Sequence, residues 1–195
     1  MVRQIFERED LIPKLAEIFR QHGYEGASIG SIVAETGAGR SSLYHFFPGG
    51  KEEMAAAVLD NVALWFETHI FTPLDTLPEA EAIPTMIRAV TEYFRSGQRI
   101  CLVGAFALDR TRDLFAERIA QYFDRWLTSL SGCLRRAGLP EDAAFARAAQ
   151  TIAAIQGAIV LTRATARDCL FHEVIAQIAA PSPQLSQADA KDSPS

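Results

Sequence analysis

Side chains able to contact a polyanion are concentrated in one short stretch of this chain, residues 28–51. Their hydroxyl, imidazole, guanidinium and ammonium donors can reach phosphate oxygens or base edges, and they are Ser28, Arg40, Ser41, Ser42, Tyr44, His45 and Lys51. No acidic residue lies between Thr36 and Lys51, as a surface facing a polyanion requires. We expect Tyr44 and Lys51 to contact phosphates, and Arg40, with the two serines after it, to reach base edges of double-stranded DNA.

Patterns for catalysis or metal binding are missing from the sequence. There is no His-Glu-x-x-His or Gly-x-Ser-x-Gly motif, and Gly49-Gly50-Lys51 is too short for a phosphate-binding loop. No metal-ligand spacing is present, and the histidines lie far apart, at His22, His45, His69 and His172. We therefore expect no enzyme activity, no metal and no cofactor.

Two short helices joined by a glycine turn are predicted to position the donor side chains. Ser28 is a good N-cap for a helix that Thr36-Gly37 closes. The second helix is expected from Arg40 to about Phe47, because the residue before a proline is pushed out of the helical region. This arrangement is typical of a helix-turn-helix, whose second helix lies in the major groove. Apolar residues should lock it to a preceding helix: Ile29, Ile32, Val33, Leu43 and Phe47.

The rest of the chain has helical periodicity and no strand pattern, so the predicted fold class is all-α. A first helix is expected from about Asp10 to His22, with Pro13 in its first turn. A longer one should run from Lys51 until Pro73 stops it. The further predicted elements are a helix from Pro84 to near Gly97, a buried helix or connector at 100–108, long helices at 112–137 and 142–167, and a last helix at 170–179. The end of the chain, 181–195, is rich in Pro, Ser, Gln and Asp and is predicted to be disordered.

Composition is that of a soluble globular protein of 195 residues, 49% of them hydrophobic. The net charge of −5 argues against indiscriminate coating of nucleic acid. Residues 1–51 hold six basic and six acidic side chains, so the prediction of DNA binding depends on the motif more than on charge. Three widely spaced cysteines, no signal peptide and no membrane-length apolar run favour the reducing cytoplasm.

The 28–51 stretch resembles the DNA-binding domain of TetR-family transcriptional regulators. The matching positions, in order, are Ser28, Ile32-Val33, Thr36-Gly37, Leu43-Tyr44-His45-Phe46-Phe47 and Lys51-Glu52. The run from Phe47 to Glu53 is one residue longer than the common linker and is similar to the LmrA/YxaF-like branch. Gly39 departs from the pattern, since the family usually has a serine cap there. A glycine cap costs only a few tenths of a kcal/mol against serine.

The resemblance implies a three-helix head, residues 1–50, and a ligand-binding and dimerisation domain, residues 51–180. It places a small-molecule pocket among helices that here bear aromatic and polar side chains: Trp65, Phe66, His69, Phe94, Cys101, Phe106, Tyr122, Phe123, Trp126 and Gln156. For any one of these residues other than Gln156, ordinary core packing is the simpler interpretation. An aromatic-lined cavity suits a small hydrophobic or aromatic effector.

Dimerisation through the last two helices, about 142–167 and 170–179, is also implied by the resemblance. The 142–167 helix is rich in small residues, which let two helices approach closely, and its candidate contact residues are Ala149, Ala153, Ile152, Ile155 and Ile159. A homodimer would present two heads to the half-sites of a palindrome, roughly 34 Å apart.

The expected function is that of a ligand-responsive repressor that an effector releases from its operator. An activator has the same sequence features, because the position of the operator decides between the two. The alternative from another class is an all-helical small-molecule-binding protein or enzyme that has kept the head but lost DNA binding.

Overall fold

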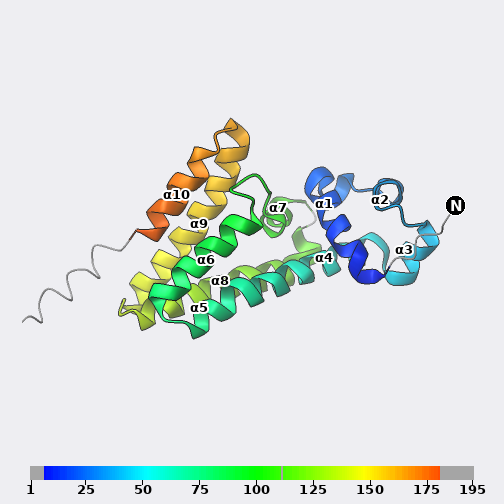
Figure 1. Ribbon diagram of the computed structural model, residues 1–195. Coiled ribbons are helices and arrows are strands. Elements are labelled where there is room, and N and C mark those ends of the chain that lie inside the picture. The colour runs from blue at the N-terminus through cyan, green and yellow to red at the C-terminus, as the bar shows by residue number, and fades with distance from the viewer. Residues whose placement is uncertain (1–6, 111, 181–195) are drawn as a thin grey trace, which may run out of the picture. The chain divides into compact units, whose positions relative to one another are not determined.

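The computed structural model describes residues 7–110 and 112–180, and every element in these ranges is helical. The all-α prediction is confirmed. The segment 181–195, predicted to be disordered, lies outside the described residues. The chain divides into two compact units (Figure 1). Unit 1 contains Met1–Phe66 and Ile100–Phe123, and unit 2 contains Glu67–Arg99 and Asp124–Ser195. The predicted boundary between a DNA-binding head, residues 1–50, and a ligand-binding and dimerisation domain, residues 51–180, is a division by function, and it stays a prediction.

Four helices begin unit 1: α1 (Arg8–Gly26), α2 (Ile29–Thr36), α3 (Arg40–Phe46) and α4 (Gly50–Phe66). The Ser28 hydroxyl accepts a hydrogen bond from the Ser31 backbone N–H at 3.1 Å, which is the N-cap predicted for α2. Gly37 ends α2 in the left-handed region, at φ 74°. Helix α1 packs against α2, and α2 against α3. The fully buried apolar side chains of this part of the chain include Leu15, Phe19, Ile32, Leu43 and Phe47.

Pro13 and Pro84 were expected at the beginning of their helices, and both lie further inside. Pro13 lies inside α1, because the helix already begins at Arg8, where the Glu7 N–H donates to the Asp10 carboxylate at 3.1 Å. Pro84 likewise lies inside α6 (Glu79–Tyr93) instead of starting it. The N-cap of α6 is Pro78, and the acidic residues that follow favour an early helix start.

The helix that leaves the head does not stop at Pro73. After α4, a π-helical turn, η1 (Glu67–Phe71), leads into α5 (Thr72–Thr76). Pro73 stands in the first turn of α5, where its missing N–H needs no partner. The prediction that Pro73 ends this helix was therefore wrong. A proline in the first turn of a helix disrupts no backbone hydrogen bond, unlike a proline in the interior.

The remaining elements of unit 1 are α7 (Leu102–Leu108) and η2 (Arg112–Phe115), followed by the start of α8 (Ala116–Arg136), which belongs to this unit as far as Phe123. The apolar run predicted as a helix or connector is thus the helix α7. Unit 2 contains η1, α5, α6, the part of α8 from Asp124 onward, α9 (Glu141–Thr165) and α10 (Cys169–Ala179).

Helix α9 is long and apolar enough to cross a membrane by length and composition alone. Eight of its side chains are buried, however, and α10 packs against it. A buried core helix of a water-soluble protein meets the same length and composition criteria, so this feature is weak support for a membrane span.

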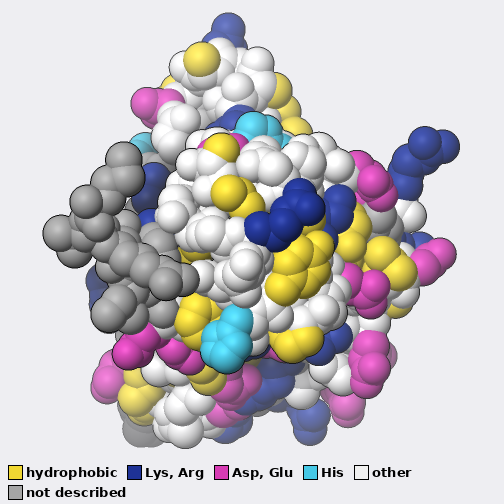
Figure 2. Space-filling view, turned by 90° about the vertical axis from the view of Figure 1, so that its right-hand side faces the viewer, with side chains coloured by type: hydrophobic (Ala, Val, Ile, Leu, Met, Phe, Trp, Pro, Cys, Tyr) yellow, Lys and Arg dark blue, Asp and Glu magenta, His cyan; other side chains and the backbone are white. Residues whose placement is uncertain are grey.

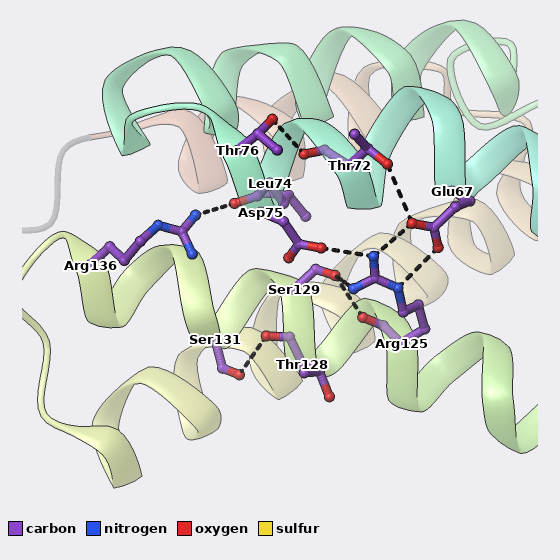
Figure 3. A network of polar contacts seen from close by, with 10 residues as sticks. All are labelled: Glu67, Thr72, Leu74, Asp75, Thr76, Arg125, Thr128, Ser129, Ser131 and Arg136. Carbon is purple, nitrogen blue, oxygen red and sulfur yellow. Dashed lines mark hydrogen bonds and ion pairs between the residues drawn. The ribbon is translucent and has the colours of Figure 1, made fainter.

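An arginine network fastens α8 to the turn formed by η1 and α5 within unit 2 (Figure 3). The Arg125 guanidinium donates to both Glu67 carboxylate oxygens, at 2.6 and 2.9 Å, and to Asp75 at 2.7 Å. It also donates to the Ser129 hydroxyl at 2.6 Å, and Arg136 donates to the Leu74 carbonyl. The hydrogen bond to Glu67 raises the pKa of Arg125 above its ordinary value, so the guanidinium stays charged. This network holds the π-helical turn against α8.

Replacing Arg125 with methionine is expected to lower the free energy of unfolding by about 1–2 kcal/mol, because two carboxylates lose a shared cation. The estimate is modest because the Arg125, Glu67 and Asp75 side chains are 36%, 40% and 37% exposed, and solvent screens their attraction. Arg125→Lys should recover only part of the loss, since an ammonium cannot bind Glu67 through two parallel bonds. Urea unfolding followed by circular dichroism measures both variants, and a methionine variant as stable as the wild type would contradict the role of the network.

Candidate nucleic-acid interface

Helix α3 presents its polar side to solvent and its apolar side to the core of unit 1. Leu43 is completely buried, whereas Arg40, Ser41, Tyr44 and His45 are exposed. Tyr44 is 43% exposed, a large fraction for a residue of this size. Ser42 and Phe46 are half-buried at the sides of the helix. One face of α3 is therefore covered with donors, as the sequence predicted for a helix that enters a groove.

The turn before α3 is held by hydrogen bonds. The Thr36 hydroxyl donates to the Ile32 carbonyl at 2.6 Å and accepts from the Ala38 N–H at 3.2 Å. Lys14 of α1 donates to the Thr36 carbonyl at 3.0 Å. Sequence reasoning missed Lys14, since a lone lysine on a helix gives no signal of what it contacts. Together these bonds fix the angle at which α3 leaves α2 without a side-chain cap at Gly39.

The charge around this face suits an anionic partner. Figure 2 looks onto the end of unit 1 that carries α2 and α3, and acidic side chains lie mainly toward the edges of the view. Uncharged, hydrophobic, histidine and cationic side chains occupy the middle. The exposed Glu35 carboxylate of α2 lies 2.9 Å from His22 Nε2.

Two predicted DNA-binding residues already have partners inside the chain. The Ser28 hydroxyl is occupied as the cap of α2. The Lys51 ammonium donates to the Tyr24 carbonyl at 2.9 Å and lies 4.3 Å from the centroid of the Tyr24 ring. Lys51 is half-buried, so part of the side chain remains accessible at the first turn of α4.

The predicted ligand-binding residues of unit 1 fall into separate groups. Phe66 and Tyr122 are buried with ring centroids 5.0 Å apart, and the half-buried Trp65 and Phe123 lie beside them at 5.4 and 5.0 Å. Phe106 instead packs against α1, with its ring 6.1 Å from that of Phe19. Cys101 is the N-cap of α7, where its sulfur accepts from the Gly104 N–H at 3.3 Å. Phe106 and Cys101 therefore have structural roles in unit 1, and a ligand-binding role for either stays a prediction.

The predicted ligand-binding residues of unit 2 are also mostly packed. Trp126 and Phe94 are fully buried, and His69 is exposed. Gln156 is half-buried, and its Nε2 atom is buried without a hydrogen-bond partner among the described residues. A polar atom in this state is costly unless a ligand or water satisfies it. Gln156 is therefore the residue of this group whose chemistry most favours contact with a ligand.

A cleft of about 60 Å³ lies elsewhere in unit 2, and none of the predicted aromatic residues lines it. Its walls include Met86, Leu130 and Ile178, with Glu79 and Arg147 beside them. The volume is well below the roughly 300 Å³ at which pockets for drug-sized ligands begin. Among the described residues no group of three or more His, Cys, Asp or Glu could hold a metal ion.

The predicted dimerisation residues lie mostly inside the chain. Ile152, Ile155 and Ile159 are buried at 6%, 1% and 3% exposure, Ala149 is half-buried and Ala153 is exposed. The large apolar side chains that α9 exposes are Phe145, Val160 and Leu161, each more than half exposed. Spacing alone does not tell which side of a helix faces the core, and a dimerisation role for these five residues stays a prediction.

Comparisons with known families cover both ends of the described chain. Residues 12–58 match the family described as bacterial regulatory proteins, tetR family. Residues 79–177 match the family described as transcriptional regulator LmrA/YxaF-like, C-terminal domain.

Curated relatives align with most of the chain at low identity. The HTH-type transcriptional regulator LmrA of Bacillus subtilis is 26% identical over 160 residues, covering 80% of this chain and 85% of the relative. The uncharacterized HTH-type transcriptional regulator YxaF of the same organism is 28% identical over 160 residues, covering 80% and 84%. The HTH-type transcriptional repressor DhaR of Mycobacterium sp. is 26% identical over 135 residues, covering 65% of each chain.

Solved structures share the fold. A TetR transcriptional regulator from Legionella pneumophila superposes with a TM-score of 0.79 at 20% identity, covering 92% of this chain and 98% of that one. The regulatory protein TetR from Rhodobacter sphaeroides superposes with a TM-score of 0.74 at 19% identity, covering 87% and 95%.

Proposed function

The chain belongs to the TetR family of transcriptional regulators and has an LmrA/YxaF-like C-terminal domain, and from this premise we propose that it is a ligand-responsive repressor. In this proposal it acts in the cytoplasm as a homodimer on a palindromic operator, and a small hydrophobic or aromatic effector releases it. The observation that carries the proposal is α3, which exposes Arg40, Ser41, Tyr44 and His45 on one side while Leu43 anchors the other.

Dimerisation is supported by the outward side of α9. Phe145, Val160 and Leu161 expose apolar surface on a helix whose inner side is already buried. Exposed apolar side chains that lie together mark protein–protein contacts, and Val160 and Leu161 are neighbours near the C-terminal end of α9. A symmetric dimer would use the same side of α9 in both chains and present two copies of α3 to DNA.

Release by an effector requires that the effector bind one conformation of the dimer more tightly than the other. Gln156, with its unsatisfied buried amide nitrogen, and the aromatic group around Phe66 and Tyr122 are the candidates for that contact. They lie in different units, and each can be tested separately by its effect on release while operator binding is kept.

Replacing Arg40 with alanine is expected to weaken binding to a specific duplex by about 10–100-fold, since an arginine–guanine contact contributes about 1–3 kcal/mol of discrimination. The duplex would be selected by the wild-type protein from a random-sequence DNA pool, and binding measured by fluorescence anisotropy at moderate salt. Binding to a scrambled duplex should change far less, because that interaction depends on total charge.

Arg88→Ala is the matched control, because it removes an equal charge from an exposed position in α6. Equal losses in the two variants would contradict the assignment of Arg40 to a base edge. Failure of the wild-type protein to select any duplex would contradict DNA binding itself and favour the alternative of a binding protein or enzyme that has kept an unused head.

A further inference from the structure

Tyr24 lies at the point where α1 breaks. Gly23 adopts a positive φ of 67°, which interrupts the regular helix and turns the chain toward α2. The Tyr24 side chain is 8% exposed. Burial is the main cause that raises the pKa of its phenol, followed by the charges of Glu52 and Glu25, so the hydroxyl is neutral at physiological pH.

Three aromatic rings hold the Tyr24 ring in place, all of them in unit 1. Phe19 of α1 stacks on it at 6.1 Å between centroids. Phe106 of α7 and Phe115 of η2 meet it edge to face, at 6.0 and 5.4 Å. Edge-to-face pairs at these separations are favourable beyond simple burial. The orientation of Tyr24 is therefore set by two segments that lie far apart in the sequence.

Tyr24 in turn fixes the ammonium of Lys51 with two different groups. Its backbone carbonyl accepts a hydrogen bond from Nζ at 2.9 Å, and its ring face lies 4.3 Å from the same atom. A lysine side chain has several rotatable bonds, so an unrestrained ammonium loses considerable conformational entropy when it binds a phosphate. Here that entropy is already lost in the free protein, because the side chain is held before DNA arrives.

The held ammonium is close to the end of the recognition helix. Lys51 stands in the first turn of α4, directly after the short linker that follows α3. Gly50, beside it, packs near the Tyr44 ring, where a Cβ atom would come within 3.6 Å of Tyr44 Cε1. An ammonium has three donors, and the Tyr24 carbonyl uses one of them.

We propose that Tyr24 is a positioning residue for DNA binding, which holds the Lys51 ammonium in the orientation that contacts a backbone phosphate beside α3. This inference rests on the proposed DNA-binding function. A buried tyrosine of α1 thereby contributes to the affinity and to the salt dependence of DNA binding.

The test compares Tyr24→Leu, which removes the ring face, with Tyr24→Phe, which keeps it. Binding to the duplex selected by the wild-type protein is measured by anisotropy across a range of salt concentrations. Tyr24→Leu is expected to bind about tenfold more weakly. The negative slope of log association constant against log salt concentration should become shallower by about one, the value for one lost phosphate contact. Tyr24→Phe should keep the wild-type slope.

Phe115→Leu is the control for a purely structural effect, because it removes a ring from the same cluster without removing the one under Lys51. It should lower the thermal midpoint and leave the salt slope unchanged. A double-mutant cycle adds a second readout: in a Lys51→Met background, Tyr24→Leu should cause no further fall in slope. If Tyr24→Leu does not fold, Tyr24→Met serves the same comparison, since it fills the space without an aromatic face.

The proposal is overturned if the folded Tyr24 variant keeps the wild-type slope, if Phe115→Leu lowers the slope equally, or if the effect of Tyr24 persists without Lys51. A steeper slope would also overturn it, because it would mean that Tyr24 withholds the ammonium from DNA. Selection of a duplex by the wild-type protein in these same assays would leave the proposed function standing while this inference fails.

Discussion

A chain carrying alanine in place of Phe47 is expected to lose DNA binding, because the head would no longer hold α3 against α1. Phe47 is completely buried directly after α3, and the Arg8 guanidinium lies 5.0 Å from its ring centroid. Removing a buried phenylalanine costs about 3–5 kcal/mol, since both transfer energy and packing are lost. Thermal unfolding followed by circular dichroism should show a midpoint lower by roughly 10 °C for a chain of this size.

The adjacent Phe46 supplies the matched control. Its side chain is half-buried, with the His45 ring 5.2 Å away, so Phe46→Ala removes the same atoms from a much less packed site. We expect a loss of roughly 1 kcal/mol for this variant, the central value for an ordinary substitution. Equal midpoints for the two alanine variants would show that Phe47 does not anchor the recognition helix.

Trp126→Ala is the second substitution with a large expected effect, about 3–5 kcal/mol of unfolding free energy. The indole is fully buried in unit 2, with the Phe71 ring of η1 6.4 Å away. We expect DNA binding to persist at low temperature, because the contact face of α3 belongs to unit 1. Differential scanning calorimetry would show the lower stability directly.

Thr128→Ala, on the exposed side of the same helix, is the control and should change stability by no more than about 0.5 kcal/mol. If Trp126→Ala abolished DNA binding under conditions where the chain remained folded, the tryptophan would have a role beyond packing. The next experiment would then test the prediction that Trp126 lines an effector site. It would compare how readily an effector releases Trp126→Phe and the wild-type protein from DNA.

Local signals predicted the bounds of α2 accurately. Ser28 and Gly37 bound α2 as expected, because a cap hydroxyl and a left-handed glycine each depend on only a few neighbouring residues. The same is true of the exposure of Arg40 and Tyr44, which follows from their spacing around Leu43. Periodicity of this kind needs no knowledge of the rest of the fold.

Features that depend on distant contacts were missed. Nothing near Glu67 in the sequence indicates a π-helical turn, because its partner Arg125 lies far along the chain. For the same reason, the sequence did not predict the packing of Phe106 on Phe19 or the contact of Lys51 with Tyr24, because each pair lies far apart in the chain. It also left the inner and outer halves of α9 undistinguished, since burial is decided by α10 and the other helices of unit 2.

The aromatic cluster around Tyr24 makes the head dependent on residues far downstream. A fragment cut after Phe66 would keep Phe19 and Tyr24 but lose Phe106 and Phe115, leaving two large rings in contact with water. Such a fragment would fold less autonomously and aggregate more readily than a self-contained helix-turn-helix module. During synthesis, the core of the first 66 residues therefore cannot be complete until the segment from 100 to 115 has left the ribosome.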